Sequence, residues 1–278
     1  MSRISFSEIH EQPWFPNFLR NDVTDGLQFT LNFGGVYRPA ASCLRRALKA
    51  AGTDRFVDLC SGAGGPWLWL CRHLKGGNTG KLEVCLTDKY PNIAAFERLH
   101  EVSGGTIGYC TEPVDAARIP AQLHGFRTLF TSFHHFSPAE AAAIIQDAVD
   151  TRQGIGIFEA PRRGMLSILL TALMPISAFL LTPFIRPFRV SRVVWTYLLP
   201  VIPFVLWFDG VLSCLRAYSP AELSKLIANL KANDYTWEIG EQTGWLAPIT
   251  YMLGYPESPA NNRATDLAKT AAAIQADA

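Results

Sequence analysis

A glycine-rich segment that joins an apolar strand to a helix is the part of this sequence best suited to hold a ligand. Residues 57–66 read VDLCSGAGGP. Glycines at such a turn let a ligand approach the backbone closely, because no Cβ atom stands in the way. The G-x-G-x-x-G spacing of a nicotinamide dinucleotide site would need a third glycine at Trp67, whose side chain is too large for close packing of helix on strand. This residue disfavours a nucleotide-dependent oxidoreductase.

Polar residues also follow the later apolar segments of the chain. Asp88, Asp115 and the pair His134 and His135 each come after a short apolar segment of the kind that forms a buried strand. The carboxyl ends of parallel strands meet at one edge of a sheet, and such sheets bind their ligands at that edge. We therefore expect these side chains to lie beside the glycine-rich turn.

The glycine-rich segment resembles motif I of class I S-adenosylmethionine-dependent methyltransferases, of the type that methylates small molecules. The family pattern is an acid in the strand, here Asp58, followed by G-x-G-x-G. Gly62 and Gly64 match the second and third glycines, whereas Cys60 replaces the first. The resemblance covers about residues 40–160 by motif and 217–256 by architecture.

The resemblance implies S-adenosyl-L-methionine as the methyl donor. In this family an acid at the place of Asp88 accepts hydrogen bonds from the ribose hydroxyls, and an acid at the place of Asp115 contacts the adenine. The end of the fourth strand is where the methyl group meets the acceptor. The residues that the resemblance assigns to the donor are Asp58, Cys60, Ser61, Gly62, Gly64, Asp88, Lys89, Asp115, Ala116 and Ser132.

Methyl transfer is an in-line displacement, so alignment of the two reactants supplies much of the catalysis. A base is needed only when the acceptor arrives protonated, as a phenol or an ammonium does. His134 and His135 are the catalytic candidates, because histidine titrates near neutral pH, although adjacent side chains point apart and at most one would face the acceptor. Alternatively, they shape the pocket. The residues expected to bind the substrate are Tyr37, Glu159, Arg162, Asp209 and Arg216.

Strands and helices alternate strictly over the segment that carries these residues. Apolar segments at 55–60, 82–87, 106–110, 127–133 and 154–158 are separated by helical stretches. This alternation predicts right-handed crossovers and a parallel sheet that is covered on both faces. Two strands at 235–241 and 249–255 are joined by a short turn and should pair antiparallel. The predicted fold class is α/β, with a doubly wound, mostly parallel seven-stranded sheet, an antiparallel C-terminal hairpin and a hydrophobic helical insertion.

The composition changes along the chain and predicts five regions. An N-terminal cap or flap is expected to cover the donor with the aromatic side chains of Trp14, Phe15, Phe18 and Phe29. Before the last helix, Ser219 is predicted to be the N-cap residue, with a capping box. The regions are the cap (1–40), the donor-binding core (41–160), a hydrophobic helical lid (161–217), the C-terminal part of the core (218–256) and a flexible tail (257–278).

The predicted lid is unusually apolar. Residues 165–185 carry no charge and are long enough to span a bilayer, whereas the uncharged stretch 193–208 is marginal. Prolines interrupt both stretches. A spanning hairpin would also place Arg186, Arg189 and Arg192 opposite the catalytic domain, against the positive-inside rule. We expect a lid that encloses an apolar acceptor and contacts a membrane surface, with the arginines on lipid headgroups or on an acidic group of the substrate. A larger core and a dimer interface are the alternatives.

Composition excludes several other classes. The chain has 25 Lys and Arg against 24 Asp and Glu, a net charge of +1, which argues against a nucleic-acid partner. Its 49% hydrophobic content excludes overall disorder. The six cysteines form no CxxC pair and no zinc-ligand spacing, so no metal is predicted and reduced thiols are expected. The N-terminus lacks the apolar core of a signal peptide.

The sequence thus predicts a cytoplasmic methyltransferase, peripheral on the inner face of a membrane, that moves a methyl group onto O, N or C of a hydrophobic small molecule. The alternative is a membrane-surface or lipid-binding protein with a degenerate methyltransferase fold, which Cys60 in the loop supports. The acceptor atom and the oligomeric state stay open at this point.

Overall fold

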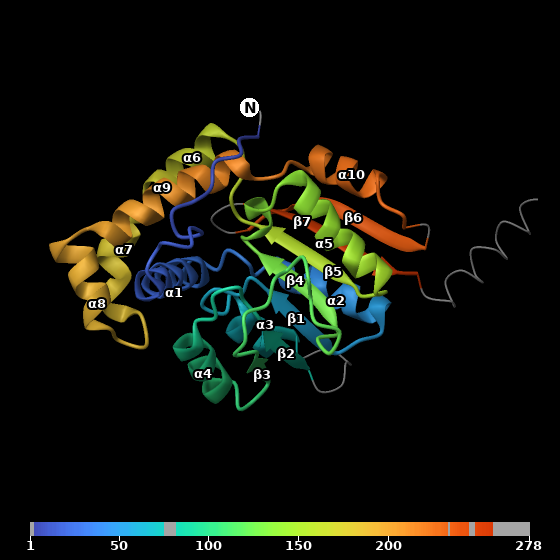
Figure 1. Cartoon of the computed structure of the whole chain (residues 1–278), viewed down its shortest axis with the longest axis horizontal. Coiled ribbons are helices and arrows are strands. Elements are labelled where there is room, and N and C mark those ends of the chain that lie inside the picture. The colour runs from blue at the N-terminus through green and yellow to red at the C-terminus, as the bar shows by residue number, and fades with distance from the viewer. Residues whose placement is uncertain (1–2, 75–81, 233, 245–247, 258–278) are drawn as a thin grey trace, which may run out of the picture.

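The computed structural model describes residues 3–74, 82–232, 234–244 and 248–257 of the 278-residue chain. Its centre is a seven-stranded sheet in the order β3-β2-β1-β4-β5-β7-β6 (Figure 1). β1 to β5 run parallel, whereas β7 is antiparallel to β5 and β6. The predicted sheet, with its C-terminal hairpin, is therefore confirmed. The strands are β1 (Arg55–Leu59), β2 (Glu83–Leu86), β3 (Ile107–Tyr109), β4 (Phe126–Phe130), β5 (Ile155–Glu159), β6 (Tyr235–Gln242) and β7 (Ile249–Pro256).

The strand order determines where a ligand can bind. β1 lies between β2 and β4, so the chain moves outward from β1 to β3 and then returns to the opposite side of β1. The loops that follow β1 and β4 diverge at this reversal and leave a crevice beyond the carboxyl ends of the strands. The glycine-rich turn follows β1, and the two adjacent histidines follow β4.

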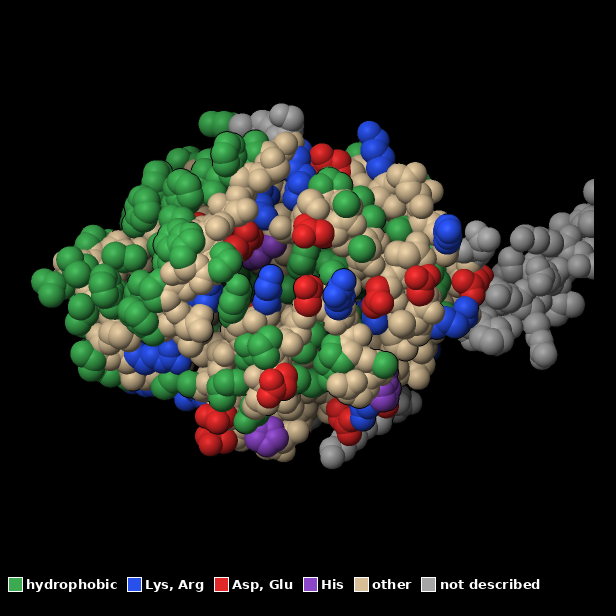
Figure 2. Space-filling model, viewed as in Figure 1, with side chains coloured by type: hydrophobic (Ala, Val, Ile, Leu, Met, Phe, Trp, Pro, Cys, Tyr) green, Lys and Arg blue, Asp and Glu red, His purple; other side chains and the backbone are tan. Residues whose placement is uncertain are grey.

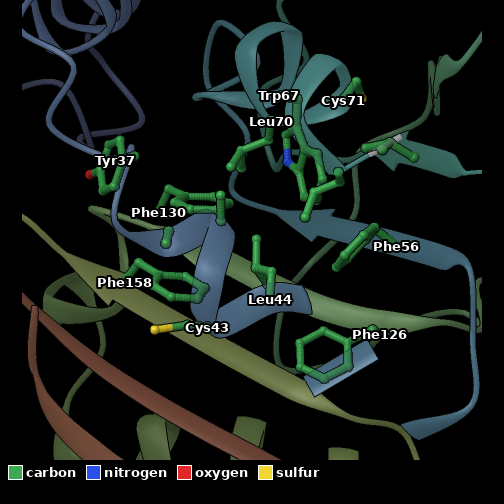
Figure 3. Packing of buried hydrophobic residues seen from close by; sticks show 14 of the residues in the cluster. Tyr37, Cys43, Leu44, Phe56, Trp67, Leu70, Cys71, Phe126, Phe130 and Phe158 are labelled. Atoms are coloured by element: carbon green, nitrogen blue, oxygen red, sulfur yellow. The ribbon is translucent and has the colours of Figure 1, made fainter. Parts of the chain in front are cut away.

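Helices cover both faces of the sheet (Figure 1). One apolar cluster joins the sheet to α2 (Ala40–Ala51), α3 (Trp67–Leu74) and α4 (Ile93–Val102), and another joins it to α5 (Pro138–Asp150) and α10 (Pro220–Ala228). Trp67 is fully buried and packs on the rings of Phe56 and Phe130 (Figure 3). The residue that breaks the dinucleotide pattern is therefore a core residue.

α10 begins with the predicted capping box. The Ser219 side chain accepts a hydrogen bond from the backbone N–H of Glu222, and the Glu222 side chain accepts one from the backbone N–H of Ser219. The predicted tail 257–278 lies outside the described residues, except for Glu257.

α1 (Asn17–Phe33) and a helical insertion lie beside the sheet rather than on it (Figure 1). α1 packs on α7, α8 and α9, while α6 and α7 pack along α9 as a helical hairpin. Leu19 and Val23 of α1 share an apolar cluster with Val205 and Leu206 of α9. The insertion consists of α6 (Met165–Ala172), α7 (Met174–Leu181), the 3₁₀ turn η2 (Thr182–Phe184), α8 (Val190–Val193), the π-helical η3 (Val194–Leu198) and α9 (Val201–Arg216).

Candidate active site

A cavity of about 440 Å³ lies at the carboxyl edge of β1, β2 and β4. Its floor is the glycine-rich turn, with Cys60, Ser61 and Gly62, and its walls include Asp88 and Ser132. The N-terminal segment and α1 close it from outside. The structure thus brings together residues from three strand ends that the sequence analysis assigned to one ligand.

The glycine-rich turn adopts a left-handed backbone at four of its positions. The φ angles are +54° at Cys60, +56° at Gly62, +97° at Gly64 and +49° at Gly65. Glycine tolerates this conformation, whereas a residue with a Cβ atom is strained by about 1–2 kcal/mol. The position where Cys60 departs from the family pattern is therefore one that favours glycine, and such strain is concentrated at functional sites.

Asp58 supports this turn from below. Its carboxylate accepts hydrogen bonds from Ser61 Oγ at 2.7 Å and Thr128 Oγ1 at 2.6 Å, and it is not among the residues that line the cavity. Burial raises the pKa of Asp58 to about 6, although these hydrogen bonds favour the charged form. Asp58 holds the loop in place rather than presenting its carboxylate to the cavity.

Asp88 connects the end of β2 to the glycine-rich turn. Its Oδ2 accepts a hydrogen bond from the Gly62 backbone N–H at 2.7 Å, and its Oδ1 accepts one from the Tyr90 N–H at 2.8 Å. Burial raises the pKa of Asp88, and the two backbone N–H groups act in the opposite direction. A carboxylate oxygen has a second lone pair, so Asp88 can still accept hydrogen bonds from a ligand. Lys89 lines the cavity beside it.

Ser132 offers an unused polar group to the cavity. The residue is 3% exposed, it lines the cavity, and its Oγ has no hydrogen-bond partner among the described residues. Buried hydroxyl groups are normally paired, so this oxygen fits a polar ligand atom. Tyr37 also lines the cavity and hydrogen-bonds Thr131 Oγ1, and burial raises the pKa of its phenol well above the usual value.

The two adjacent histidines have different environments. His135 lines the cavity, with its Nδ1 3.1 Å from Glu11 Oε1. His134 is fully buried behind the wall, with its Nδ1 2.5 Å from Glu159 Oε2 and its Nε2 3.2 Å from Glu8 Oε1. Burial lowers the pKa of His134, but the charge and hydrogen bond of Glu159, together with Glu8, raise it to about 10. His134 is therefore an imidazolium at neutral pH.

The N-terminal segment contributes residues that the sequence analysis missed. Glu8 is buried between His134 and His135, and His10 and Glu11 line the cavity. Burial alone would raise the pKa of Glu8, but the two imidazoles hold it well below its ordinary value. Nothing in the short segment 7–13 indicates that it reaches the end of β4, because its partners there, His134 and His135, are more than a hundred residues away.

α1 forms a wall of the cavity and contacts the glycine-rich turn. Thr24, Gln28 and Asn32 line the cavity, and the side-chain amides of Gln28 and Asn32 donate to the carbonyl oxygen of Gly65. Their spacing of four residues places them on one helix face. This polar stripe is the signal that could have identified α1 as a wall of the site.

Four residues predicted to bind the substrate lie outside the cavity lining. Glu159 accepts hydrogen bonds from the backbone N–H groups of Ser132 and Phe133, so it shapes the turn after β4. Asp209 accepts from the backbone N–H groups of Ile9 and His10. The two others are Arg216, which pairs with Glu8 and Glu11, and Arg162, which pairs with Glu241.

Some residues predicted to bind the donor also lie outside the lining. A Cβ atom at Gly64 would lie 2.0 Å from Leu99 Cδ1, so this glycine permits close packing of the turn on α4. Ala116 is buried in the core, and Asp115 is exposed, with its Oδ1 accepting from the Ala117 N–H at 2.9 Å.

The predicted cap lines the cavity mostly with polar residues and not with the four aromatic residues expected to cover the donor. Trp14 and Phe18 are largely exposed, Phe15 packs against the insertion, and Phe29 stacks on Phe33. None of these aromatic side chains is among the residues that line the cavity in the described part of the chain.

The insertion lies behind α1 rather than over the cavity. Within the described ranges, no residue of 161–217 lines the cavity. The prediction that Arg192 faces lipid or the substrate is wrong, because its side chain is 1% exposed and pairs with Asp25 of α1. Arg189 also turns toward α1, 3.5 Å from Asp22, whereas Arg186 is exposed.

The carboxylates and imidazoles at the end of β4 also have the geometry of a cation site. Glu8, His134 and His135 can offer ligand atoms that lie within 4.8 Å of one another, and so can Glu8, His10 and Asp209. Arg216 already supplies positive charge to Glu8 and Glu11. We therefore interpret the cluster as an ion-pair network that anchors the N-terminal segment.

Comparison with known proteins identifies the fold. No protein-family model matches this chain, and no curated protein is similar to it in sequence. The O-methyltransferase NcsB1 from neocarzinostatin biosynthesis, solved with S-adenosyl-L-homocysteine and 1,4-dihydroxy-2-naphthoic acid, matches with a TM-score of 0.50 and 14% identity. The chain has a class I methyltransferase fold. The match covers 83% of this chain and 56% of NcsB1.

A second solved structure, PigF with S-adenosylhomocysteine, matches with a TM-score of 0.50 and 15% identity, over 88% of this chain and 62% of PigF. The methyltransferase-fold chain thus spans less than two thirds of either protein. At these identities the likeness concerns the fold alone, and the activity must be argued from the cavity.

Proposed function

We propose that this protein transfers a methyl group from S-adenosyl-L-methionine to a hydrophobic small molecule. The observation that carries the proposal is the single cavity that joins Gly62, Asp88, Ser132 and His135 at the carboxyl edge of the sheet. The solved structures of similar fold, NcsB1 and PigF, hold S-adenosylhomocysteine. When bound, the donor supplies an electrophilic methyl group on a sulfonium centre.

The residues around the cavity fit the polar parts of such a donor. Asp88 has acceptor capacity for a ribose diol, and Gly62 leaves the backbone open beside it. The unpaired Oγ of Ser132 offers a further hydrogen bond. We assign donor binding also to Cys60, Ser61 and Lys89, which line the same cavity.

The chain's own residues would align the acceptor and remove its proton. His135 is the imidazole on the cavity wall, so we assign it as the base for a hydroxyl or ammonium acceptor. Glu11 beside Nδ1 would stabilise the imidazolium that forms. His134 is already protonated and buried, so its assigned role is to position the turn that carries His135. Tyr37 lines the same cavity and hydrogen-bonds Thr131, next to Ser132, so we assign it a contact with the acceptor or the donor.

The test is calorimetric titration with S-adenosylhomocysteine. We expect binding at one site, and Asp88→Asn should weaken it about 10–100-fold, as the loss of hydrogen bonds to a charged group does. Asp150→Asn is the matched control, because Asp150 is exposed at the end of α5. Absence of binding by the wild-type protein, or equal affinities of the two variants, would contradict the proposal.

The alternative of a degenerate fold without donor binding is less well supported. A degenerate site would be expected to lose its cavity or its polar lining, whereas here Asp88 still faces the cavity beside an open glycine backbone. The strain at Cys60 affects the loop backbone without filling the cavity.

A further inference from the structure

The exposed surface of the helical insertion is unusually apolar (Figure 2). Large hydrophobic side chains are exposed along α6, α7 and α9, among them Leu166, Leu169, Leu180 and Phe204. In Figure 2 they gather over the end of the molecule where Figure 1 places α6 to α9. Elsewhere in the described chain, such side chains are exposed only at Phe6, Trp14, Phe18, Phe33 and Val102.

The composition of this surface matches lipid rather than water. The segment Met165–Phe184 is 20 residues long, with a mean hydropathy of 2.1, and only 11% of its most apolar window is buried. A core helix of similar composition would be mostly buried. Val190–Leu198 and Val201–Arg216 form a second apolar pair, bent by 78°. By length and composition, these helices could enter a membrane.

The contacts of the insertion determine how it can meet a bilayer. One face of the hairpin is already covered by α1, through Val205 and Leu206. α8 is tied to α1 by the buried pair Arg192–Asp25, and Arg189, the residue before α8, pairs with Asp22 of α1. The opposite side of α1 lines the cavity with polar groups, which cannot enter hydrocarbon. Among the described residues, the outer face of the hairpin is the face that nothing covers.

Charge favours a lipid headgroup region over a protein partner. Residues 160–208 contain five arginines and no Asp, Glu or Lys. Arg186 is exposed in the connection after η2, where its guanidinium can reach anionic headgroups while its stem lies among apolar side chains. Protein interfaces of ordinary size carry about ten hydrogen bonds, whereas the exposed side chains of α6 and α7 offer almost no donors or acceptors.

We propose that α6 to α9 insert their outer face into one leaflet of an anionic phospholipid bilayer, with the hairpin lying in the membrane plane. α1 then separates the bilayer from the cavity. The proposal does not depend on methyltransferase activity, because it rests on the exposed surface alone.

The test is flotation with vesicles of phosphatidylcholine, with and without phosphatidylglycerol, in the absence of methyl donor. The wild-type protein should float with both and bind more tightly when phosphatidylglycerol is present. The double variant Leu166→Glu/Leu180→Glu should lose at least about a hundredfold in partitioning, because two Leu side chains no longer enter hydrocarbon. These side chains are 70% and 65% exposed, and Glu is a good helix former, so the fold should persist.

The matched control is Phe33→Glu/Val102→Glu, which adds the same charges at exposed apolar positions outside the insertion. It should float like the wild-type protein. Arg186→Gln should weaken binding to the anionic vesicles about fivefold and leave binding to phosphatidylcholine unchanged. Equal flotation of Leu166→Glu/Leu180→Glu and wild type would overturn the proposal. A second outcome would also overturn the proposal: the wild-type protein does not bind vesicles but forms a dimer, and Leu166→Glu/Leu180→Glu dissociates this dimer. The surface would then be covered by a second copy of the chain.

Discussion

The imidazole of His134 lies with its Nδ1 2.5 Å from Glu159 Oε2, and both side chains are almost fully buried. Glu159 ends β5, and His134 follows β4, so the pair joins the turn after β4 to the neighbouring strand. The same Glu159 carboxylate accepts the backbone N–H groups of Ser132 and Phe133. This buried ion pair therefore helps to hold the cavity wall that carries Ser132 and His135.

This pair should make stability depend on pH. The pKa of His134 is raised to about 10 in the folded protein, against about 6.5 when unfolded. A raised pKa of a cation contributes stability that is complete below about pH 6.5 and is lost as the pH rises through about 10. His134→Gln should cost about 3–5 kcal/mol near neutral pH, and its free energy of unfolding should fall less than that of wild type between pH 7 and 10.

Urea denaturation across this pH range would measure the difference. His124→Gln is the control, because His124 is exposed on a loop. Parallel pH profiles for His134→Gln and the wild-type protein would show that the pair does not carry this charge.

The left-handed backbone at Cys60 predicts an unusual effect of a cysteine-to-glycine change. Cys60→Gly relieves about 1–2 kcal/mol of backbone strain, and the added freedom of the unfolded chain offsets about 0.5–1 kcal/mol of that gain. The free energy of unfolding should therefore stay equal or rise by up to about 1.5 kcal/mol. Cys85→Gly, in strand β2, should instead lose about 1 kcal/mol. A clear loss at both positions in chemical denaturation would refute the strain at Cys60.

The parts of the fold that were predictable are those with local signals. Buried parallel strands such as β1 and β5 are continuous apolar runs, and the glycine-rich turn between β1 and α3 has a fixed residue pattern. Asp88 and Ser132 were predictable as cavity residues because topology alone brings strand ends together.

The remainder of the site depends on long-range contacts that leave no local pattern. Glu8 contacts His134, although more than a hundred residues separate them in the sequence. Neither residue lies in a local sequence pattern that indicates the other as its partner. The sequence shows that the insertion is apolar. Its tertiary packing is needed to show that α1 separates it from the cavity and that Arg192 points inward to Asp25. Apolar composition has the same pattern whether a helix faces lipid, substrate or core.

Gly64 should tolerate substitution less well than another left-handed glycine. A Cβ atom there would lie 2.0 Å from Leu99 Cδ1, and Leu99 is buried. Gly64→Ala should cost about 2–5 kcal/mol, the sum of left-handed strain and overpacking. Gly52, with φ of +63°, has no atom within 4 Å of such a Cβ, so Gly52→Ala should cost only about 1–2 kcal/mol. Thermal unfolding that ranks Gly52→Ala as the more damaging change would contradict this packing.

The buried pair of Asp25 and Arg192 should couple the insertion to the cavity. Asp25 lies on α1, 3% exposed, and its loss leaves the Arg192 guanidinium without its closest partner. Asp25→Ala should cost about 3–5 kcal/mol, and the double variant Asp25→Ala/Arg192→Met should be more stable than Asp25→Ala, because no charge is then left unpaired.

Asp25→Ala should also change the affinity for the ligand. α1 also places Thr24 and Asn32 on the cavity wall, so Asp25→Ala should weaken binding of S-adenosylhomocysteine, and the double variant should restore part of it. Denaturation and calorimetry on the same three proteins would measure both effects. A loss of stability with unchanged affinity would mean that α1 keeps its place on the cavity without this ion pair, and that the insertion does not influence the site through it.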